Sequence, residues 1–154
     1  CFKKQIRLLT MCNTENNLGS ETTAITTLGI HHLGLSVPNI KETAAFFIEQ
    51  LNFNVVGEKP DYPAIFVSDG TVMLTLWQVN DASKMITFDR KNNIGLHHFA
   101  LKVANLEQLQ QLFEKLSQLD SVDIEFAPEP LGELPIHHMM CLIPGGIRLE
   151  LITA

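Results

Sequence analysis

Two histidine doublets occupy equivalent places in a repeated segment of the chain. The stretch IHHLGLSV at residues 30–37 returns as LHHFALKV at residues 96–103, with a constant offset of 98 − 32 = 66 residues. Imidazole is a common metal ligand and also the side chain that most readily gains and loses a proton near neutral pH. The repeat therefore places side chains that can do chemistry in two equivalent strands.

A carboxylate joins these imidazoles when the strands are sorted by alternation, because successive side chains of a strand point to opposite faces. His32, His98 and Glu150 each lie on the face opposite the apolar residues of their strand. Small neighbours such as Gly34 and Ala100 leave space on that side. We call it the hollow face, since the Leu- and Val-rich face is the one that the helices must cover.

Two imidazoles and one carboxylate that face a common hollow are a suitable donor set for a divalent metal. Three protein ligands leave positions open for water and substrate, so that the ion can polarise a carbonyl or activate an oxygen nucleophile. The alternative is that each group is an ordinary hydrogen-bonded or surface residue. Burial of three ionisable groups without partners is costly, which weighs against that alternative without excluding it.

Other histidines have different expected roles. Only one member of each strand doublet can face the hollow, which leaves His31 and His97 as half-buried structural residues. No catalytic residue is identified outright, but Glu150 and His138 are candidate proton carriers, with His137 as the alternative to His138.

Two cationic side chains on the hollow face are candidates for binding an anionic substrate. Arg148 and Lys102 share that face with Glu150 and His98, respectively. Guanidinium and ammonium groups donate charge-assisted hydrogen bonds to carboxylates. The alternative is a salt bridge at the rim, for Arg148 with Glu125, Glu129 or Glu133.

Each copy of the repeat is expected to run as a strand, a helix and three more strands. Asn39 and Asn105 are good N-caps, and the apolar spacing behind them predicts helices at about 39–51 and 105–119. β-prone runs predict strands at about 30–37, 53–58, 64–68 and 71–79, and then at about 96–103, 122–126, 136–143 and 147–153. The predicted fold is α+β, with two βαβββ modules that pair into a cupped mixed sheet, because a lone four-stranded module is marginal.

The predicted organisation is one domain with an N-terminal extension. Residues 13–28 are rich in Asn, Thr, Ser and Glu, and residues 1–28 are predicted to form an N-terminal tail or arm. The domain is expected at 29–153, with module one at 29–80, a linker at 81–94 and module two at 95–153.

Composition argues against several classes of function. Eleven Lys and Arg against seventeen Asp and Glu give a net charge of −6, which disfavours binding to nucleic acid. No stretch approaches the ~20 apolar residues that a membrane span needs. Three cysteines without a Cys-x-x-Cys spacing argue against a disulfide framework and a zinc ribbon, so we expect reduced thiols and a cytoplasmic protein.

The chain from about residue 28 to residue 153 resembles the vicinal oxygen chelate superfamily, which includes glyoxalase I, fosfomycin-resistance thiol transferases, extradiol dioxygenases and bleomycin-resistance proteins. The resemblance rests on IHHLGLSV, on GLHHFALKV and on PGGIRLEL in the last strand. It implies paired βαβββ modules cupped around one divalent metal, with His32, His98 and Glu150 as ligands. The ion is expected to be Mn, Ni, Zn, Fe or Co, since imidazole and carboxylate accept several metals.

The fourth ligand position of glyoxalase I-like relatives falls on Thr75, whose hydroxyl is a poor ligand. The resemblance therefore favours a three-ligand site. From their places on the hollow face, Thr75 and Trp77 are candidates for contacting the substrate. Trp77 and Met73 are candidates for an apolar wall, with ordinary packing as the alternative. The resemblance implies a metal-dependent lyase, isomerase, thiol transferase or dioxygenase acting on a small, anionic substrate that chelates the ion through adjacent oxygens.

The alternative function is that of a metal-free protein that sequesters a drug or another ligand, as bleomycin-resistance proteins do. Small relatives usually form homodimers, which is the expectation here too.

Overall fold

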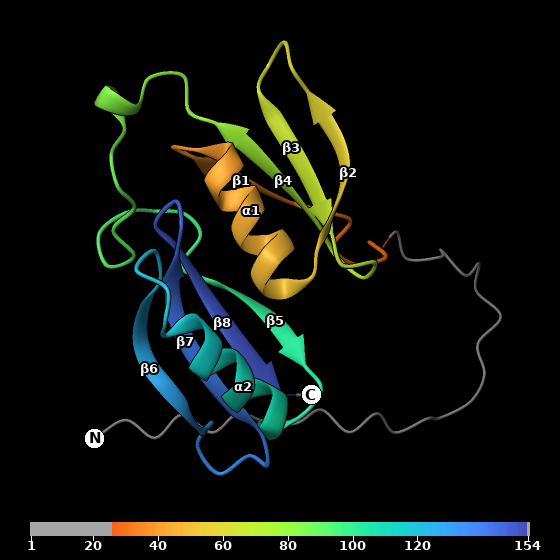
Figure 1. The fold of residues 1–154 in the computed structure, drawn as a ribbon, viewed down its shortest axis with the longest axis vertical. Helices are drawn as coiled ribbons and strands as arrows, with labels where there is room; N and C mark the ends of the chain where they lie inside the picture. The colour runs from red at the N-terminus through yellow and green to blue at the C-terminus, as the bar shows by residue number, and fades with distance from the viewer. Residues whose placement is uncertain (1–25, 154) are drawn as a thin grey trace, which may run out of the picture.

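Each half of the chain runs as one strand, one helix and three further strands (Figure 1). The computed structural model describes residues 26–153. The first module contains β1 (Leu33–Val37), α1 (Ile40–Leu51), β2 (Asn54–Lys59), β3 (Ala64–Ser68) and β4 (Met73–Gln78). The short helix η1 (Ala82–Lys84) follows in the linker. The second module contains β5 (Phe99–Val103), α2 (Leu106–Leu116), β6 (Asp123–Pro130), β7 (His137–Ile143) and β8 (Ile147–Thr153).

The predicted α+β fold of two βαβββ modules is confirmed. The predicted N-terminal tail lies, up to residue 25, outside the described residues. The exact limits of the domain and its modules stay predictions. None of the helices within residues 26–153 combines the length and the apolar character that crossing a membrane requires.

Both helices begin at the predicted asparagine caps. Asn39 Oδ1 accepts a hydrogen bond from the Glu42 backbone N–H at 3.3 Å, and Asn105 Oδ1 accepts one from Gln108 N–H at 2.9 Å. Each cap satisfies an N–H that the helix itself leaves without a partner. Helix α2 ends at Leu116, three residues before the predicted end, because the following chain tightens into a turn in which Leu119 N–H donates to Leu116 O.

Within residues 26–153 the strands form two four-stranded sheets, in the order β1-β4-β3-β2 and β5-β8-β7-β6, and not the single cupped sheet into which the modules were expected to pair. In each sheet the edge strand, β1 or β5, is parallel to its neighbour and the other pairs are antiparallel. The ladders begin at the pairs Leu33–Leu74 and Phe99–Leu149. Both histidine doublets therefore lie just before a strand, whereas the alternation had placed them inside it.

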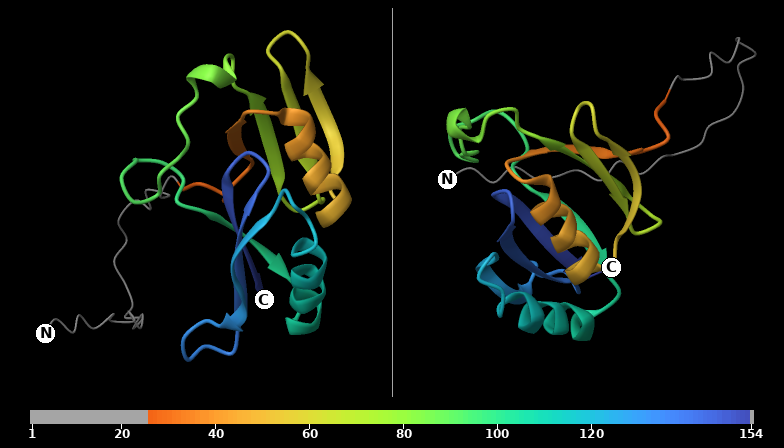
Figure 2. Two further views of the ribbon diagram at one scale, coloured as in Figure 1. Left: turned by 60° about the vertical axis from the view of Figure 1, so that its left-hand side comes forward. Right: turned by 45° about the horizontal axis from the view of Figure 1, so that its top comes forward.

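The two modules bury their helix-side faces in one common core. Thr43 Oγ1 in α1 donates to the carbonyl of Pro144, in the turn between β7 and β8, at 3.2 Å. Lys115 Nζ in α2 donates to the carbonyl of Glu49, at the end of α1, at 2.9 Å. Figure 2 accordingly shows α1 next to the strands of the second module. Since the core takes the helix-side face of both sheets, the hollow faces point away from it.

The alternation predicted along the strands agrees with the observed burial. Residues predicted for the core side are almost completely buried in β1, β4 and β8: Leu35, Val37, Leu74, Leu76, Leu149 and Leu151. Their neighbours in sequence lie on the hollow faces, where the candidate site residues are found.

Candidate functional site

On the hollow face of the second module, the carboxylate of Glu150 contacts the imidazoles of His98 and His138. Glu150 Oε2 lies 3.3 Å from His98 Nε2, and Glu150 Oε1 lies 2.5 Å from His138 Nδ1. Glu150 is only 9% exposed. A buried carboxylate is stable when both oxygens have partners, and here each oxygen has one.

Three neighbouring strands position this group of side chains. Glu150 pairs with Ala100 of β5 on one side and with Met140 of β7 on the other. His98 directly precedes β5, the strand that contains Ala100. The alternation along the strands therefore predicted correctly that His98 and Glu150 are neighbours.

His138 connects Glu150 to the surface. Its other ring nitrogen, Nε2, lies 3.9 Å from Glu129 Oε1, and the Glu129 side chain is 58% exposed. The ring of Phe126 lies 5.0 Å from the His138 ring, centroid to centroid. Imidazole can accept a proton on one nitrogen and release one from the other. The arrangement is suited to moving a proton between Glu150 and solvent.

Arg148 is engaged by Glu125 in a two-pronged ion pair. Its Nε donates to both Glu125 oxygens at 2.9 Å, and its Nη2 donates to Glu125 Oε2 at 2.7 Å. Arg90 Nη1, from the linker, lies 3.5 Å from Glu125 Oε1. The hydrogen bonds from Arg148 are the main reason why the pKa of Glu125 lies below its ordinary value. The rim pairing considered for Arg148 is thus present, and a substrate would have to share or displace it.

His97 and Cys141 also have shifted pKa values, although neither belongs to the group of side chains around Glu150. Loss of hydration, with the nearby charge of Arg148 second, lowers the pKa of His97. Burial raises the pKa of the Cys141 thiol to about 12. Cys141 lies on the core side of β7 and is fully buried, so it remains a protonated, unreactive thiol near neutral pH.

The hollow face of the first module is aromatic. Trp77 Nε1 donates to the buried Thr75 hydroxyl at 3.0 Å, which orients the indole. Tyr62 and Phe66 lie against Trp77, with ring centroids 5.3 and 5.7 Å away, and Lys59 Nζ lies 5.8 Å from the Trp77 ring centroid. We call Tyr62, Phe66 and Trp77 the aromatic floor.

His32 lies on this first module and not beside Glu150. It is exposed, it precedes β1, and its Nδ1 is 2.9 Å from His31 Nδ1. Among residues 26–153 no group of three or more His, Cys, Asp and Glu side chains is placed to hold a metal ion. Two of the three predicted ligands, His98 and Glu150, therefore lie together on the second module. The third, His32, lies on the first module of the same chain.

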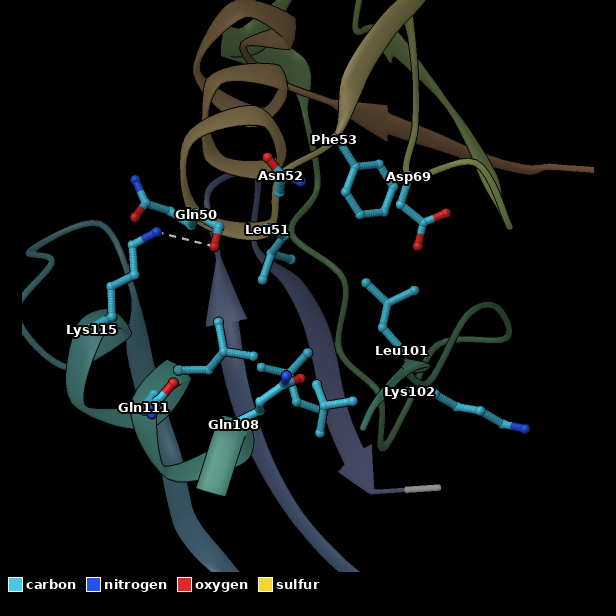
Figure 3. Close-up of a pocket in the computed structure, with 13 residues that line it drawn as sticks. Gln50, Leu51, Asn52, Phe53, Asp69, Leu101, Lys102, Gln108, Gln111 and Lys115 are labelled. Carbon is cyan, nitrogen blue, oxygen red and sulfur yellow. Dashed lines mark hydrogen bonds between the residues drawn. The ribbon is translucent and has the colours of Figure 1, made fainter. Parts of the chain in front are cut away.

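Lys102 and Met73 are the remaining residues predicted for the hollow faces. Lys102 is exposed at the edge strand β5, where its side chain extends outward beside a cavity of about 390 Å³ (Figure 3). That cavity is lined by Leu101 and Leu151 of the core face and by Lys115 of α2, so it lies on the helix side of the sheet. Met73 is half-buried at the start of β4.

Sequence reasoning missed three residues of the hollow faces. Phe66 pairs with Thr75 across β3 and β4, so alternation along β3 could have identified it. Tyr62 and Arg90 lie in irregular segments, where no periodicity indicates which way a side chain points.

Comparison with known proteins identifies relatives of the whole described fold. The model of the Glyoxalase/Bleomycin resistance protein/Dioxygenase superfamily matches residues 29–151. No curated protein matches the chain. Among solved structures, a putative glyoxalase from Bacillus halodurans is 24% identical, with a TM-score of 0.67 over 81% of this chain and 95% of that one.

Two further structures resemble the chain at lower identity. The fosfomycin resistance protein FosX from Listeria monocytogenes is 16% identical, with a TM-score of 0.66 over 84% of this chain and 95% of that one. A lactoylglutathione lyase from Agrobacterium tumefaciens is 18% identical, with a TM-score of 0.60 over 83% and 95%. At these identities the likeness concerns the fold.

Proposed function

Because the chain belongs to the Glyoxalase/Bleomycin resistance protein/Dioxygenase superfamily, we propose that it is a divalent-metal-dependent enzyme. Its substrate is a small anion that chelates the ion through adjacent oxygens, and its reaction is that of a lyase, isomerase, thiol transferase or dioxygenase. The observation that carries this proposal is the convergence of His98 Nε2 and Glu150 Oε2, 3.3 Å apart on the hollow face. We also propose a cytoplasmic setting, because three cysteines without a pairing pattern are typical of proteins that keep their thiols reduced.

The donor set fits such an ion. An imidazole nitrogen and a carboxylate oxygen are donors that Mn, Ni, Zn, Fe and Co all accept. His138 holds one oxygen of Glu150 and leaves the other turned toward His98. When bound, the ion would act as a Lewis acid on the oxygens of the substrate.

A second copy of the chain is the proposed source of the third donor. The hollow faces point away from the core of one chain, and β1 and β5 are edge strands of the two sheets. Exposed apolar side chains near these edges include Ile30 and Ile94, and edges of this kind are usually covered in the assembled protein. We therefore propose a homodimer in which His32 of the partner subunit joins His98 and Glu150.

The remaining side chains of the hollow faces have roles that follow from their contacts. Glu150 or His138 carries a proton, with Glu129 offering the way to solvent at 3.9 Å from His138 Nε2. The aromatic floor excludes water and packs on the body of the substrate. Arg148 attracts its anionic group.

Metal content tests the proposal most directly. Wild-type protein incubated with manganese, nickel, zinc or iron is expected to retain close to one ion per chain after desalting, as measured by elemental analysis. Glu150→Gln should lose most of it, because the amide is a neutral and weaker donor. Glu129→Gln is the matched control, since Glu129 is exposed and lies away from His98. Retention of only a small fraction of an equivalent by the wild type would contradict the proposal.

The aromatic floor favours one other candidate function, which is the sequestration of a ligand without metal. Trp77, Tyr62 and Phe66 offer flat apolar surface on which a planar drug can stack. The acidic net charge of −6 suits a cationic drug. Binding that persists with chelator and in His98→Ala, but is lost in Trp77→Ala, would support this function over the enzyme.

A further inference from the structure

A cavity of about 1000 Å³ lies under the linker, where the two modules meet. The first module contributes residues 34–36 of β1 together with Pro38 and Val79, and the second contributes the β7–β8 turn and the adjoining residues of both strands. Apolar side chains from both modules and from the linker line it, among them Met85, Ile86, Phe88, Leu96, Leu142 and Ile147. Ile86, Met85 and Phe88 are all exposed, and large apolar side chains exposed close together often mark a binding surface.

The linker has a definite conformation over this cavity. The ring of Phe88 lies on the backbone of Gly95, where an added Cβ would come within 2.8 Å of the ring. Asp89 Oδ1 accepts a hydrogen bond from the Lys91 N–H at 2.8 Å. These contacts hold the turn that carries Arg90 toward the second module.

The walls of the cavity carry a surplus of positive charge. Arg90 and Arg148 both line it, and both pair with the single carboxylate of Glu125. The other two charged residues of the lining neutralise each other, since Lys84 Nζ lies 3.0 Å from Asp81 Oδ2. The four charged residues of the lining and Glu125 together carry one net positive charge, in a chain whose net charge is −6.

We propose that Arg90 and Arg148 form an anion-binding subsite at one end of this cavity. The ligand that fits it is an amphipathic acid, with one carboxylate for the two guanidinium groups and an apolar body for the walls of the linker. Arg148 is already saturated on one side by Glu125, whereas Arg90 approaches the same carboxylate only at 3.5 Å and is free to take a second one.

This inference rests on the proposed function in one respect, which is that the amphipathic acid is the substrate of the site around Glu150. Arg148 lies two residues before Glu150 on the hollow face of β8, at the ~7 Å spacing of same-face neighbours. An acid held by the two arginines would therefore reach the group of side chains around Glu150.

Calorimetric titration with hexanoate, hexanamide and acetate tests the subsite. All titrations use the full chain treated with chelator, so that they do not depend on the metal. We expect hexanoate to bind at least about tenfold more tightly than either of the other compounds. Hexanamide is neutral, so the net positive charge of the cavity does not attract it. Acetate carries the charge but lacks an apolar body to bury.

Charge variants then test the assignment. Arg90→Met should abolish the preference for acid over amide, because the remaining pair of Arg148 and Glu125 is neutral. Glu125→Gln should strengthen acid binding, since it removes the competing carboxylate. Lys91→Met is the matched control, because Lys91 is a neighbouring cation outside the cavity lining and should leave the preference unchanged.

Several outcomes would overturn the inference. Equal binding of acid and amide to the wild type would do so, as would an unchanged preference in Arg90→Met. Loss of the preference in His98→Ala would assign the anion to His98 instead. Absence of binding together with a dimer that Ile86→Asp dissociates would make the cavity an interface with a second copy. Metal content, measured separately, reports on the proposed function and leaves the acid titration unaffected.

Discussion

Glu150 shows how one residue can depend on its neighbours for both stability and function. It is a buried carboxylate whose two oxygens are taken by His98 and His138. A carboxylate held on one oxygen presents the other in a fixed direction, which is what a ligand of a metal or a proton acceptor requires. His138 is therefore a positioning residue in the proposed site.

Replacement of His138 should weaken metal binding although His138 is not one of the proposed ligands. Loss of a hydrogen-bond partner behind a ligand typically costs ~10–100-fold in metal affinity. We expect a loss of that size in His138→Ala, measured by competition with a chelator of known affinity. His137→Ala is the control, because His137 is linked to Thr153 through its backbone N–H, at 2.9 Å, and should bind metal like the wild type. Equal affinity of the two variants would refute the positioning role.

The ion pair of Glu125 and Arg148 predicts how stability depends on pH. The hydrogen bonds from Arg148 hold the pKa of Glu125 below its ordinary value of 4.5, so the pair stabilises the fold fully above that value. Its contribution is lost as pH falls below 4.5 and through the lower pKa of the folded state. In Glu125→Gln we expect a loss of about 1–3 kcal/mol in the free energy of unfolding at pH 7.

The same comparison at lower pH checks the sign. Denaturant unfolding of wild type and Glu125→Gln should show a difference that is constant from about pH 6 to pH 8 and that shrinks below pH 4.5. A difference that grows on acidification would show that the carboxylate is not stabilised in its charged form.

At the scale of the elements, the start of each helix and the turn between β7 and β8 set the geometry on which the site depends. Asn105 satisfies an N–H at the start of α2, and α2 covers the sheet that carries Glu150. Asn105→Ala should cost ~1 kcal/mol of stability, whereas Asn105→Asp should cost little because aspartate caps equally well. Thermal unfolding of the two variants measures this, and equal losses would contradict the cap.

The β7–β8 turn allows a sharper comparison between two adjacent glycines. Gly145 has φ of 98°, and a Cβ there would lie 3.2 Å from Thr43 Oγ1 and 3.3 Å from Val37 Cγ1. Gly146 has φ of 72°, with nothing within 4 Å of an added Cβ. Both replacements by alanine strain the backbone, at ~1–3 kcal/mol each, but only Gly145→Ala also pushes the modules apart.

We therefore expect Gly145→Ala to lower the midpoint of thermal unfolding more than Gly146→Ala does. The reason is that the turn contacts β1 and α1 of the first module. The reverse order would show that the contact between the modules contributes little to stability.

At the scale of the whole molecule, the proposed site requires that His32 of the partner subunit meets Glu150 in a dimer. One chain packs its modules through their helix sides and leaves the hollow faces outward. A dimer with a shared site makes a prediction that a single-chain site does not. His32→Ala and His98→Ala should each bind little metal alone, and an unfolded and refolded mixture should recover up to about one site in four, since each mixed dimer holds one intact site.

Metal content and sedimentation of the mixture provide the measurement. His32→Ala mixed with wild-type protein of known content serves as the reference for subunit exchange. A mixture that recovers no metal, or a wild-type particle that sediments as a 17.2 kDa monomer, would exclude the shared site.

The sequence by itself determined the modules and much of one hollow face. The repeat at 30–37 and 96–103 defined two equivalent units, and the asparagine caps located both helices. Alternation with a period of two placed Glu150 and His98 on the same side of their sheet, where the structure brings them within 3.3 Å. These features are local, because each depends on residues a few positions apart in one element.

Only the tertiary structure decided what lies across from these residues. Glu125 reaches Arg148 through a register shift in β6, between Ile124 and Phe126, which ends the regular alternation. Arg90 lies in a linker without a periodic sequence pattern, so its contact with Glu125 could not be predicted. His138 contacts Glu150 because β7 pairs with β8. His32 and Glu150 belong to different modules, and they stay apart because the two modules pack through their helix sides. Such packing depends on the joint shape of two apolar faces, which no single segment of sequence encodes.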